Sequence, residues 1–246
     1  MSLLTIDETK CKKDGICAAE CPRGLIVQED ENSFPRVPKT LEASCMACGH
    51  CVAICPHGAL SVPGVAVEDC PEIEKDLILS RNQAEQFLRS RRSIRWFKDK
   101  PVDRKTLEQL IHTARYAPTA SNAQNLHWTV IEGRERLEPF SRETINWMKR
   151  LIEAQPESPT AAYFRPVVAN WAAGIDGILR TAQTLIVASA PKENANGLVD
   201  VSIALAYLEL AALPLGVGTC WAGLLRGAML ADAGLVESMR LPAGHT

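Results

Sequence analysis

The C-terminal two thirds of the chain carry the spacing of apolar residues that regular secondary structure requires. Apolar side chains recur at helical spacing through residues 103–117, and residues 82–90 form a shorter segment of the same kind. Residues 199–213 are apolar at nearly every position and end before Pro214. Because a helix that is apolar on all sides must be covered, the last of these helices is predicted to lie in a core or a subunit interface.

Two further apolar segments have the length of strands. Residues 128–131 are followed by the pair Glu132-Gly133, and residues 184–190 are ended by Pro191. Strands that are separated by helices are typical of an α+β or α/β sandwich. The sequence therefore predicts the α+β fold class, with an α/β sandwich in its second part.

The first 70 residues differ in kind from the rest of the chain. They contain eight of the nine cysteines, together with many Pro and Gly residues and only short apolar pieces. An acidic stretch begins after Cys70-Pro71. We therefore predict a first domain at residues 1–70, a linker at 71–84 and a second domain at 85–246.

Composition and charge narrow the class of protein. Of the 246 residues, 46% are hydrophobic and 23% are charged, which is ordinary for a globular chain, and the net charge of −2 favours neither a nucleic-acid nor a membrane surface. No uncharged apolar run reaches the roughly 18 residues of a transmembrane helix, and Met1–Lys10 lacks the apolar core of a signal peptide. We therefore expect a cytoplasmic protein, in which clustered cysteines hold metal rather than form disulfides.

The cysteine-rich part contains an internal repeat. Residues 11–25 match residues 45–59 at an offset of 34. The matched positions are Cys11 with Cys45, Asp14 with Cys48, Gly15 with Gly49, Cys17 with Cys51, Cys21 with Cys55, Pro22 with Pro56 and Gly24 with Gly58. So many landmarks at one offset predict a duplicated unit with quasi-twofold symmetry.

The second copy reads Cys45-x2-Cys48-x2-Cys51-x3-Cys55-Pro56, which matches the cysteine run of bacterial ferredoxins. Two-residue gaps let one tight loop supply three corners of a cubane cluster, whereas the fourth cysteine binds the other cluster. A zinc site is the alternative, but zinc prefers Cys-x2-Cys pairs that a longer spacer separates. The spacing favours iron–sulfur clusters, which implies one-electron transfer at low potential.

The first copy departs from this pattern at Asp14, which stands where a cysteine is expected. A carboxylate is a harder ligand than a thiolate, so the cluster is expected to be labile at that corner. The copy resembles ferredoxins with Asp at the same place, whose cluster is [4Fe–4S] or a three-iron cluster. Alternatively, Asp14 is only a turn residue before Gly15, and Cys70 is either a substitute ligand or a spare thiol. The predicted ligands are Cys11, Asp14, Cys17 and Cys55 for cluster A, and Cys45, Cys48, Cys51 and Cys21 for cluster B.

A second kind of chemistry is indicated by Arg91-Arg92-Ser93-Ile94-Arg95. Alternate residues of an extended segment face one side, so Arg91, Ser93 and Arg95 are expected to converge. Guanidinium groups bind a phosphate dianion through paired hydrogen bonds. The alternative for this pentapeptide alone is a solvated basic surface.

The wider sequence resembles the FMN-dependent nitroreductase family over residues 85–246. The arginine segment corresponds to the family's R-x-S-x-R opening, Ala117-Pro118-Thr119-Ala120-Ser121-Asn122-Ala123-Gln124 to its A-P-S/T-x-x-N-x-Q segment, and residues 216–223 to its G-x-G-T-C-W-x-G segment. The chain is thus identified as a nitroreductase family protein with an N-terminal 2[4Fe–4S] bacterial-type ferredoxin domain.

The resemblance implies FMN bound non-covalently at the interface of a homodimer formed by the FMN domain. Members of the family usually end in a strand, a basic pair and a tail, for which this sequence has no counterpart before Thr246. We therefore expect either that the C-terminal end is missing or that FMN has fewer phosphate contacts. The implied residues are Arg91, Arg92, Ser93 and Arg95 at the phosphate, Pro118, Thr119, Ser121 and Asn122 along the ring or ribityl chain, and Trp221, Ala222 and Gly223 near the isoalloxazine. Core packing is the alternative for Cys220 and Trp221.

The predicted function is an oxidoreductase in which an external low-potential donor, of ferredoxin type or NAD(P)H-linked, reduces the clusters and the clusters reduce FMN. FMN then reduces a small electron-poor acceptor such as a nitroaromatic, and no side chain needs to act as acid or base. There is no G-x-G-x-x-G fingerprint, so any nicotinamide would have to stack on the flavin. The alternatives are an electron carrier or redox sensor without turnover, and dehalogenation or flavin modification on the same fold.

Overall fold

The computed structural model describes residues 3–246, and the chain divides into two compact units. The first unit runs up to Ser80 and also includes Thr119–Ala123. The second unit consists of Arg81–Pro118 and Gln124–Thr246. No helix among the described residues is long and apolar enough to cross a membrane.

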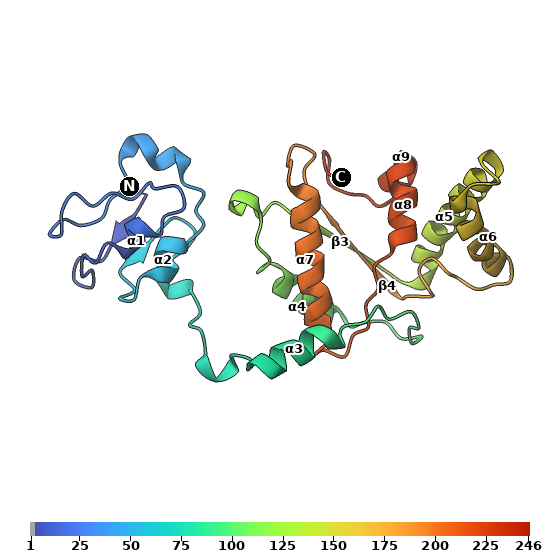
Figure 1. Ribbon diagram of the computed structural model, residues 1–246, viewed down its shortest axis with the longest axis horizontal. Helices are drawn as coiled ribbons and strands as arrows, with labels where there is room; N and C mark the ends of the chain where they lie inside the picture. The colour runs from blue at the N-terminus through green and yellow to red at the C-terminus, as the bar shows by residue number, and fades with distance from the viewer. Residues whose placement is uncertain (1–2) are drawn as a thin grey trace. The chain divides into compact units, whose positions relative to one another are not determined.

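The first unit is built from short elements (Figure 1). Two short strands pair antiparallel, with Thr5 opposite Ser61 and Ile6 opposite Leu60. Apolar side chains of Leu4, Leu25, Val52 and others form its small core, in which Cys17 is also buried. The elements are β1 (Thr5–Ile6), α1 (Ile16–Ala19), α2 (His50–Ile54) and β2 (Leu60–Ser61), with 3₁₀ turns η1 (Lys39–Ser44), η2 (Val67–Asp69), η3 (Lys75–Leu77) and η4 (Ala120–Asn122).

The internal repeat is confirmed in the backbone of this unit. Gly15 precedes α1 with φ of 74°, and Gly49 precedes α2 with φ of 71°. Both lie in the left-handed region, which glycine enters without the steric cost of a Cβ. Two residues earlier in each copy, Lys13 and Ala47 are also left-handed. The two cysteine loops therefore share one unusual backbone conformation, so that both loops curve in the same way.

The second unit holds a two-stranded sheet between two layers of helices (Figure 1). Its strands pair antiparallel, from His127 opposite Ser189 to Glu132 opposite Thr184. The elements are α3 (Arg81–Ser90), α4 (Arg104–Ala114), β3 (His127–Glu132), α5 (Arg134–Ala154), α6 (Pro159–Ala172), β4 (Thr184–Ser189), α7 (Gly197–Ala212), α8 (Gly223–Ala231) and α9 (Ala233–Ser238).

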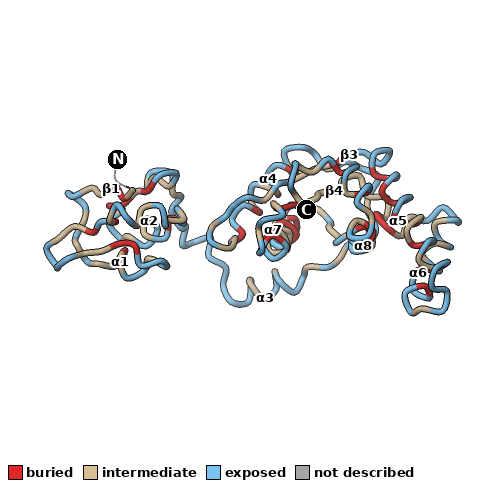
Figure 2. Tube along the Cα trace, turned by 90° about the horizontal axis from the view of Figure 1, so that it is seen from above, coloured by how far each residue is buried: buried red, intermediate tan, exposed pale blue. Residues whose placement is uncertain are grey.

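Alternate residues of the two strands reach opposite helix layers. Ile131 and Leu185 pack into a core with α5, α6, α8 and α9. Trp128 and Ile186 pack into a second core with α4 and α7. Because successive strand residues face opposite sides, one short sheet buries both of its faces. Figure 2 shows buried positions concentrated in α5, α7 and α8. The predicted α+β class with an α/β sandwich is confirmed.

The elements expected from the sequence are present, and the largest difference in extent concerns the first long helix. The helix predicted over residues 103–117 begins after Asp103, whose side chain accepts a hydrogen bond from Thr106 N at 3.0 Å. It ends at Ala114 because Ala117 precedes Pro118, and a residue before proline is disfavoured in helical conformation. The helices α5, α6, α8 and α9 were not predicted.

Candidate functional site

Two hollows open in the first unit, and each is lined by ligands from both copies of the repeat. One is lined by Cys11, Asp14 and Cys17 of the first copy and by Cys55 of the second. The other is lined by Cys45, Cys48 and Cys51 with Cys21. These are the two four-residue sets that the crossing rule predicts for clusters A and B. The donor sets therefore fit two ferredoxin-type clusters.

The thiols are free to bind such clusters, because none of the nine cysteines forms a disulfide. Within residues 3–246, no three His, Cys, Asp or Glu side chains are gathered closely enough to hold a single metal ion. The four ligands of a cubane bind four separate irons, so a ligand set spread around a hollow is the arrangement that a cluster requires.

The protonation of the thiols depends on their surroundings. Burial raises the pKa of Cys17 to about 11, and burial also raises the pKa of Cys51. Burial raises the pKa of Cys21 as well, but backbone N–H groups, first that of Leu25, outweigh it and lower the pKa overall. Iron binds the thiolate, so cluster assembly must displace the protons of the buried thiols.

Backbone N–H groups also point at equivalent sulfurs in the two copies. Leu25 N lies 3.4 Å from Cys21 Sγ, and Ala59 N lies 3.5 Å from Cys55 Sγ. Hydrogen bonds to ligand sulfurs are among the factors that set the potential of a cluster. Cys21 and Cys55 are the cysteines that each copy of the repeat contributes to the other copy's ligand set. Their sulfurs therefore have equivalent backbone contacts.

Asp14 already has a partner for each carboxylate oxygen. Its Oδ1 accepts a hydrogen bond from Ile16 N at 3.2 Å, as in a turn at the start of α1. Its Oδ2 lies 3.4 Å from His57 Nε2, and His57 lines the same hollow. An iron at this corner would have to share the carboxylate with these partners, which is a physical reason to expect weak binding there.

In the second unit, the arginine segment lies against the glycine-containing loop that follows α7. Ile94 N donates a hydrogen bond to Thr219 O at 2.8 Å. A methyl group added at Gly218 would lie 2.9 Å from Ile94 Cγ2, so only glycine permits this approach. Two of the three predicted FMN motifs, far apart in the sequence, are thus brought into direct contact.

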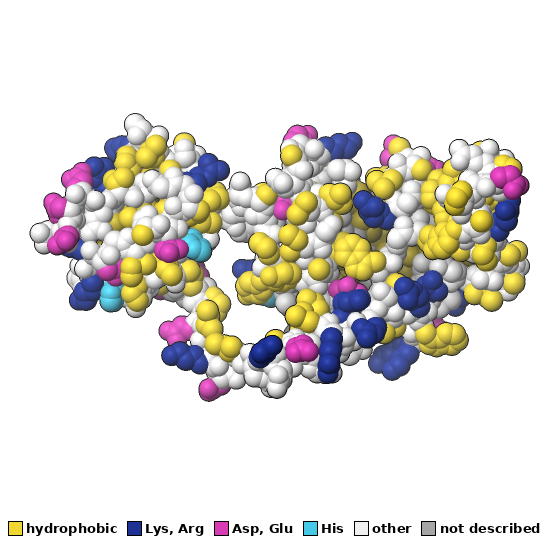
Figure 3. Space-filling view, in the orientation of Figure 1, with side chains coloured by type: hydrophobic (Ala, Val, Ile, Leu, Met, Phe, Trp, Pro, Cys, Tyr) yellow, Lys and Arg dark blue, Asp and Glu magenta, His cyan; other side chains and the backbone are white. Residues whose placement is uncertain are grey.

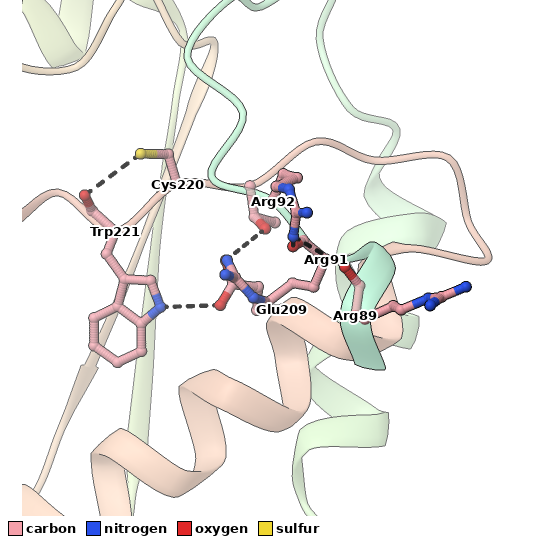
Figure 4. Close-up of polar contacts among 7 residues, drawn as sticks. Arg89, Arg91, Arg92, Glu209, Cys220 and Trp221 are labelled. Carbon is pink, nitrogen blue, oxygen red and sulfur yellow. Dashed lines mark hydrogen bonds and ion pairs between the residues drawn. The ribbon is translucent and has the colours of Figure 1, made fainter. Parts of the chain in front are cut away.

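Glu209 on α7, which was not among the residues predicted from the sequence, joins these two segments. Its side chain is buried, with Oε1 3.3 Å from Arg91 Nη1 and Oε2 3.2 Å from Trp221 Nε1 (Figure 4). A sequence signal existed, because a carboxylate inside an almost entirely apolar helix needs a partner when buried. The predicted site residues Arg91 and Trp221 therefore meet at one carboxylate.

The other two arginines of the segment, Arg92 and Arg95, lie in the more basic of the two units. Arg92 Nη1 donates to the carbonyl oxygens of Arg89 and Arg91 at the end of α3, and the Arg95 side chain is exposed. Basic side chains gather over α3 and the segment that follows it (Figure 3). Residues 81–246 contain 20 Lys and Arg against 16 Asp and Glu, whereas residues 1–80 contain 7 against 13. The positive charge therefore belongs to the unit with the predicted phosphate site.

The third predicted FMN motif is divided between the units. Pro118 is an exposed residue of the second unit, whereas Thr119, Ser121 and Asn122 belong to the first. Asn122 Nδ2 donates to Met46 O at 3.2 Å and to Ala47 O at 3.1 Å.

In the loop after α7, Trp221 is 47% exposed and Gly223 begins α8. Trp221 therefore leaves a large aromatic face open to a ligand.

The crossed ligand sets give a prediction about single cysteine substitutions. Cys55→Ser and Cys11→Ser should disturb the same cluster, and Cys21→Ser and Cys48→Ser should disturb the other, because each pair lines one hollow. EPR spectra of the dithionite-reduced variants measure this. Cys70→Ser is the matched control and should retain both signals, since its Sγ donates to Ala66 O at 3.3 Å instead. Loss of the same signal in Cys55→Ser and Cys48→Ser would contradict the crossing.

Both parts of the chain match known protein families. Residues 88–243 match the nitroreductase family, and residues 9–60 match the 4Fe-4S dicluster domain. No curated protein matches the sequence.

Three of the solved structures that are similar to this chain each have 20% sequence identity to it. A nitroreductase with bound FMN from Bacteroides fragilis NCTC 9343 covers 67% of this chain and 83% of its own, with a TM-score of 0.54. A BluB-like flavoprotein from Clostridium difficile 630 covers 65% and 82%, also at 0.54. A nitroreductase with bound FMN from Desulfitobacterium hafniense DCB-2 covers 65% and 84%, at 0.51. The fold is shared, and since the family match spans well over half of the sequence, this chain belongs to the nitroreductase family and carries a 4Fe-4S dicluster domain ahead of the nitroreductase domain.

Proposed function

We propose that this protein is an iron–sulfur flavoprotein oxidoreductase. Electrons pass from an external low-potential donor through the two clusters to FMN, and from FMN to a small electron-poor acceptor such as a nitroaromatic. The observation that carries the proposal is the pair of hollows, each lined by a complete four-ligand set, in a chain whose other unit has the nitroreductase fold. A flavin reductase fed only by a nicotinamide would not need the clusters.

The contact between the arginine segment and the loop after α7 supports FMN as the cofactor. Two of the similar structures are described as nitroreductases with bound FMN. When bound, FMN supplies the hydride and electron chemistry, and the protein binds and orients it. The residues proposed to hold it are Arg91, Arg92, Ser93 and Arg95 at the phosphate, Pro118, Thr119, Ser121 and Asn122 along the ring or ribityl chain, and Trp221, Ala222 and Gly223 near the ring.

The chain's own residues have binding and orienting roles in this proposal. Guanidinium groups at the end of α3 hold the dianionic phosphate, since their fixed donors match its oxygens. The exposed indole of Trp221 offers an apolar face that excludes water from one side of a bound ring. The proposed assembly is a homodimer through the FMN domain, and the proposed location is the cytoplasm.

Asp14 favours a second candidate function, a redox sensor or electron carrier without turnover. Because both carboxylate oxygens have protein partners, the adjacent iron is the one most easily lost. Reversible loss of one iron changes the charge of the cluster, and a sensor needs such a change. The two candidates differ in whether reduced clusters pass electrons to FMN.

The test is the iron-to-FMN ratio of one anaerobically purified sample, followed by stopped-flow reduction. About seven or eight irons per FMN would support two clusters with one flavin, seven indicating a three-iron cluster beside Asp14. On mixing with a reduced ferredoxin, bleaching of the clusters should precede bleaching of the flavin. Iron without flavin, or reduced clusters beside a flavin that stays oxidised, would refute the reductase and favour the carrier or sensor.

Gly218→Ala should weaken FMN binding, because the added methyl group would push the loop away from Ile94. We expect a loss of about 1–3 kcal/mol, typical of overpacking a tight contact. Fluorescence titration of the FMN-depleted protein measures it. Gly177→Ala is the matched control, since its new methyl group would meet Val167 at an ordinary 3.4 Å. Equal FMN affinity in both variants would show that the close approach of the two segments does not matter for binding.

A further inference from the structure

Glu209 is a buried charge in a helix of apolar residues, and its contacts reach two other segments. The residue is 7% exposed and lies in the last turn of α7. Its Oε1 lies 3.3 Å from Arg91 Nη1 and 3.5 Å from Thr219 Oγ1, and its Oε2 accepts a hydrogen bond from Trp221 Nε1 at 3.2 Å. An ionised carboxylate at this depth is stable only with such partners.

The chemistry of the contacts requires a carboxylate. Arginine and the tryptophan indole only donate hydrogen bonds, so each needs its own acceptor. The two oxygens of Glu209 serve Arg91 and Trp221 separately, as Figure 4 shows. A glutamine has one acceptor oxygen, and its NH₂ group would face a donor. A glutamine can therefore not offer each donor an oxygen of its own, and it lacks the charge that pairs with Arg91.

We propose that Glu209 is a positioning residue that couples the two ends of the flavin site, an inference that rests on the proposed function. Arg91 belongs to the phosphate end and Trp221 to the ring end. Because both bind the same carboxylate, a change at Arg91 leaves Glu209 buried without its counter-ion and disturbs the indole. Arg95 belongs to the same basic segment, but its side chain makes no contact with Glu209 among the described residues.

Riboflavin separates the two ends, because it has the ring and ribityl chain of FMN but no phosphate. An arginine that acts only on the phosphate should not affect riboflavin binding. The coupling through Glu209 predicts the opposite for Arg91. We therefore expect Arg91→Met to weaken binding of both ligands, whereas Arg95→Met weakens binding of FMN alone.

The experiment uses the full chain with its clusters in place and its FMN removed, titrated separately with FMN and with riboflavin. Arg91→Met and Glu209→Gln should each raise the riboflavin Kd about tenfold or more, the effect of losing a hydrogen bond to a charged group. Glu237→Gln, the same change at an exposed residue of α9, is the control and should leave both affinities unchanged. The double variant Arg91→Met/Glu209→Gln should bind riboflavin no more weakly than Glu209→Gln alone.

Riboflavin affinity that is unchanged in Arg91→Met, or equally lost in Arg95→Met, would overturn the coupling. If Glu209→Gln does not fold, Arg91→Met carries the test, because the Arg91 side chain is 37% exposed and methionine keeps much of its length. The proposed function fails in a different way, when the unsubstituted protein binds neither FMN nor riboflavin.

Discussion

The fold of the first unit is constrained by the crossing of its predicted cluster ligands, because each hollow is lined from both copies of the repeat. Its apolar core is small, and five of the cluster cysteines, Cys17 among them, pack against or within that core. Small domains seldom gain enough free energy from apolar burial alone and often rely on metal. Since each four-ligand set takes residues from both copies of the repeat, a bound cluster would link the two halves of the unit. Binding of the clusters and folding of this unit are therefore expected to be one process.

The second unit is organised differently, around a sheet that is buried on both faces. β3 and β4 are each covered by helices on two sides, so packing on both faces adds to the hydrogen bonds between the strands in fixing their positions. The loop after α7 and the segment after α3 are then held against this frame by backbone and side-chain contacts at Thr219 and Glu209. The two segments that carry predicted FMN residues are thus attached to an apolar framework that is built from residues of the unit itself.

The sequence predicted those features that follow from local spacing. The cysteine gaps imply the crossed sets, and the structure brings Cys55 to Cys11 and Cys21 to Cys48 as expected. The contact of Gly218 with Ile94 could not be predicted, because it joins the segment after α3 to the loop after α7, which lie far apart in the sequence. Glu209 was not predicted, because residues 199–213 were interpreted only as a buried apolar helix. The charged residue near the end of that helix was given no role. Helix α5 could have been found from Leu137, Phe140, Ile145 and Met148, which recur at helical spacing and are buried.

The two hollows differ in a way that bears on electron transfer. The hollow of cluster A is lined by Lys12, Lys13 and His57 as well as by its ligands. The hollow of cluster B is lined mainly by apolar side chains, including Leu25 and Val62, and its lining includes His50 but no Lys or Arg among the described residues. Nearby positive charge stabilises the reduced, more negative form of a cluster, whereas apolar surroundings do not, and exposure and net charge are among the factors that set cluster potentials. Two copies of one sequence motif thus have unlike surroundings, and clusters bound in the two hollows are expected to differ in reduction potential.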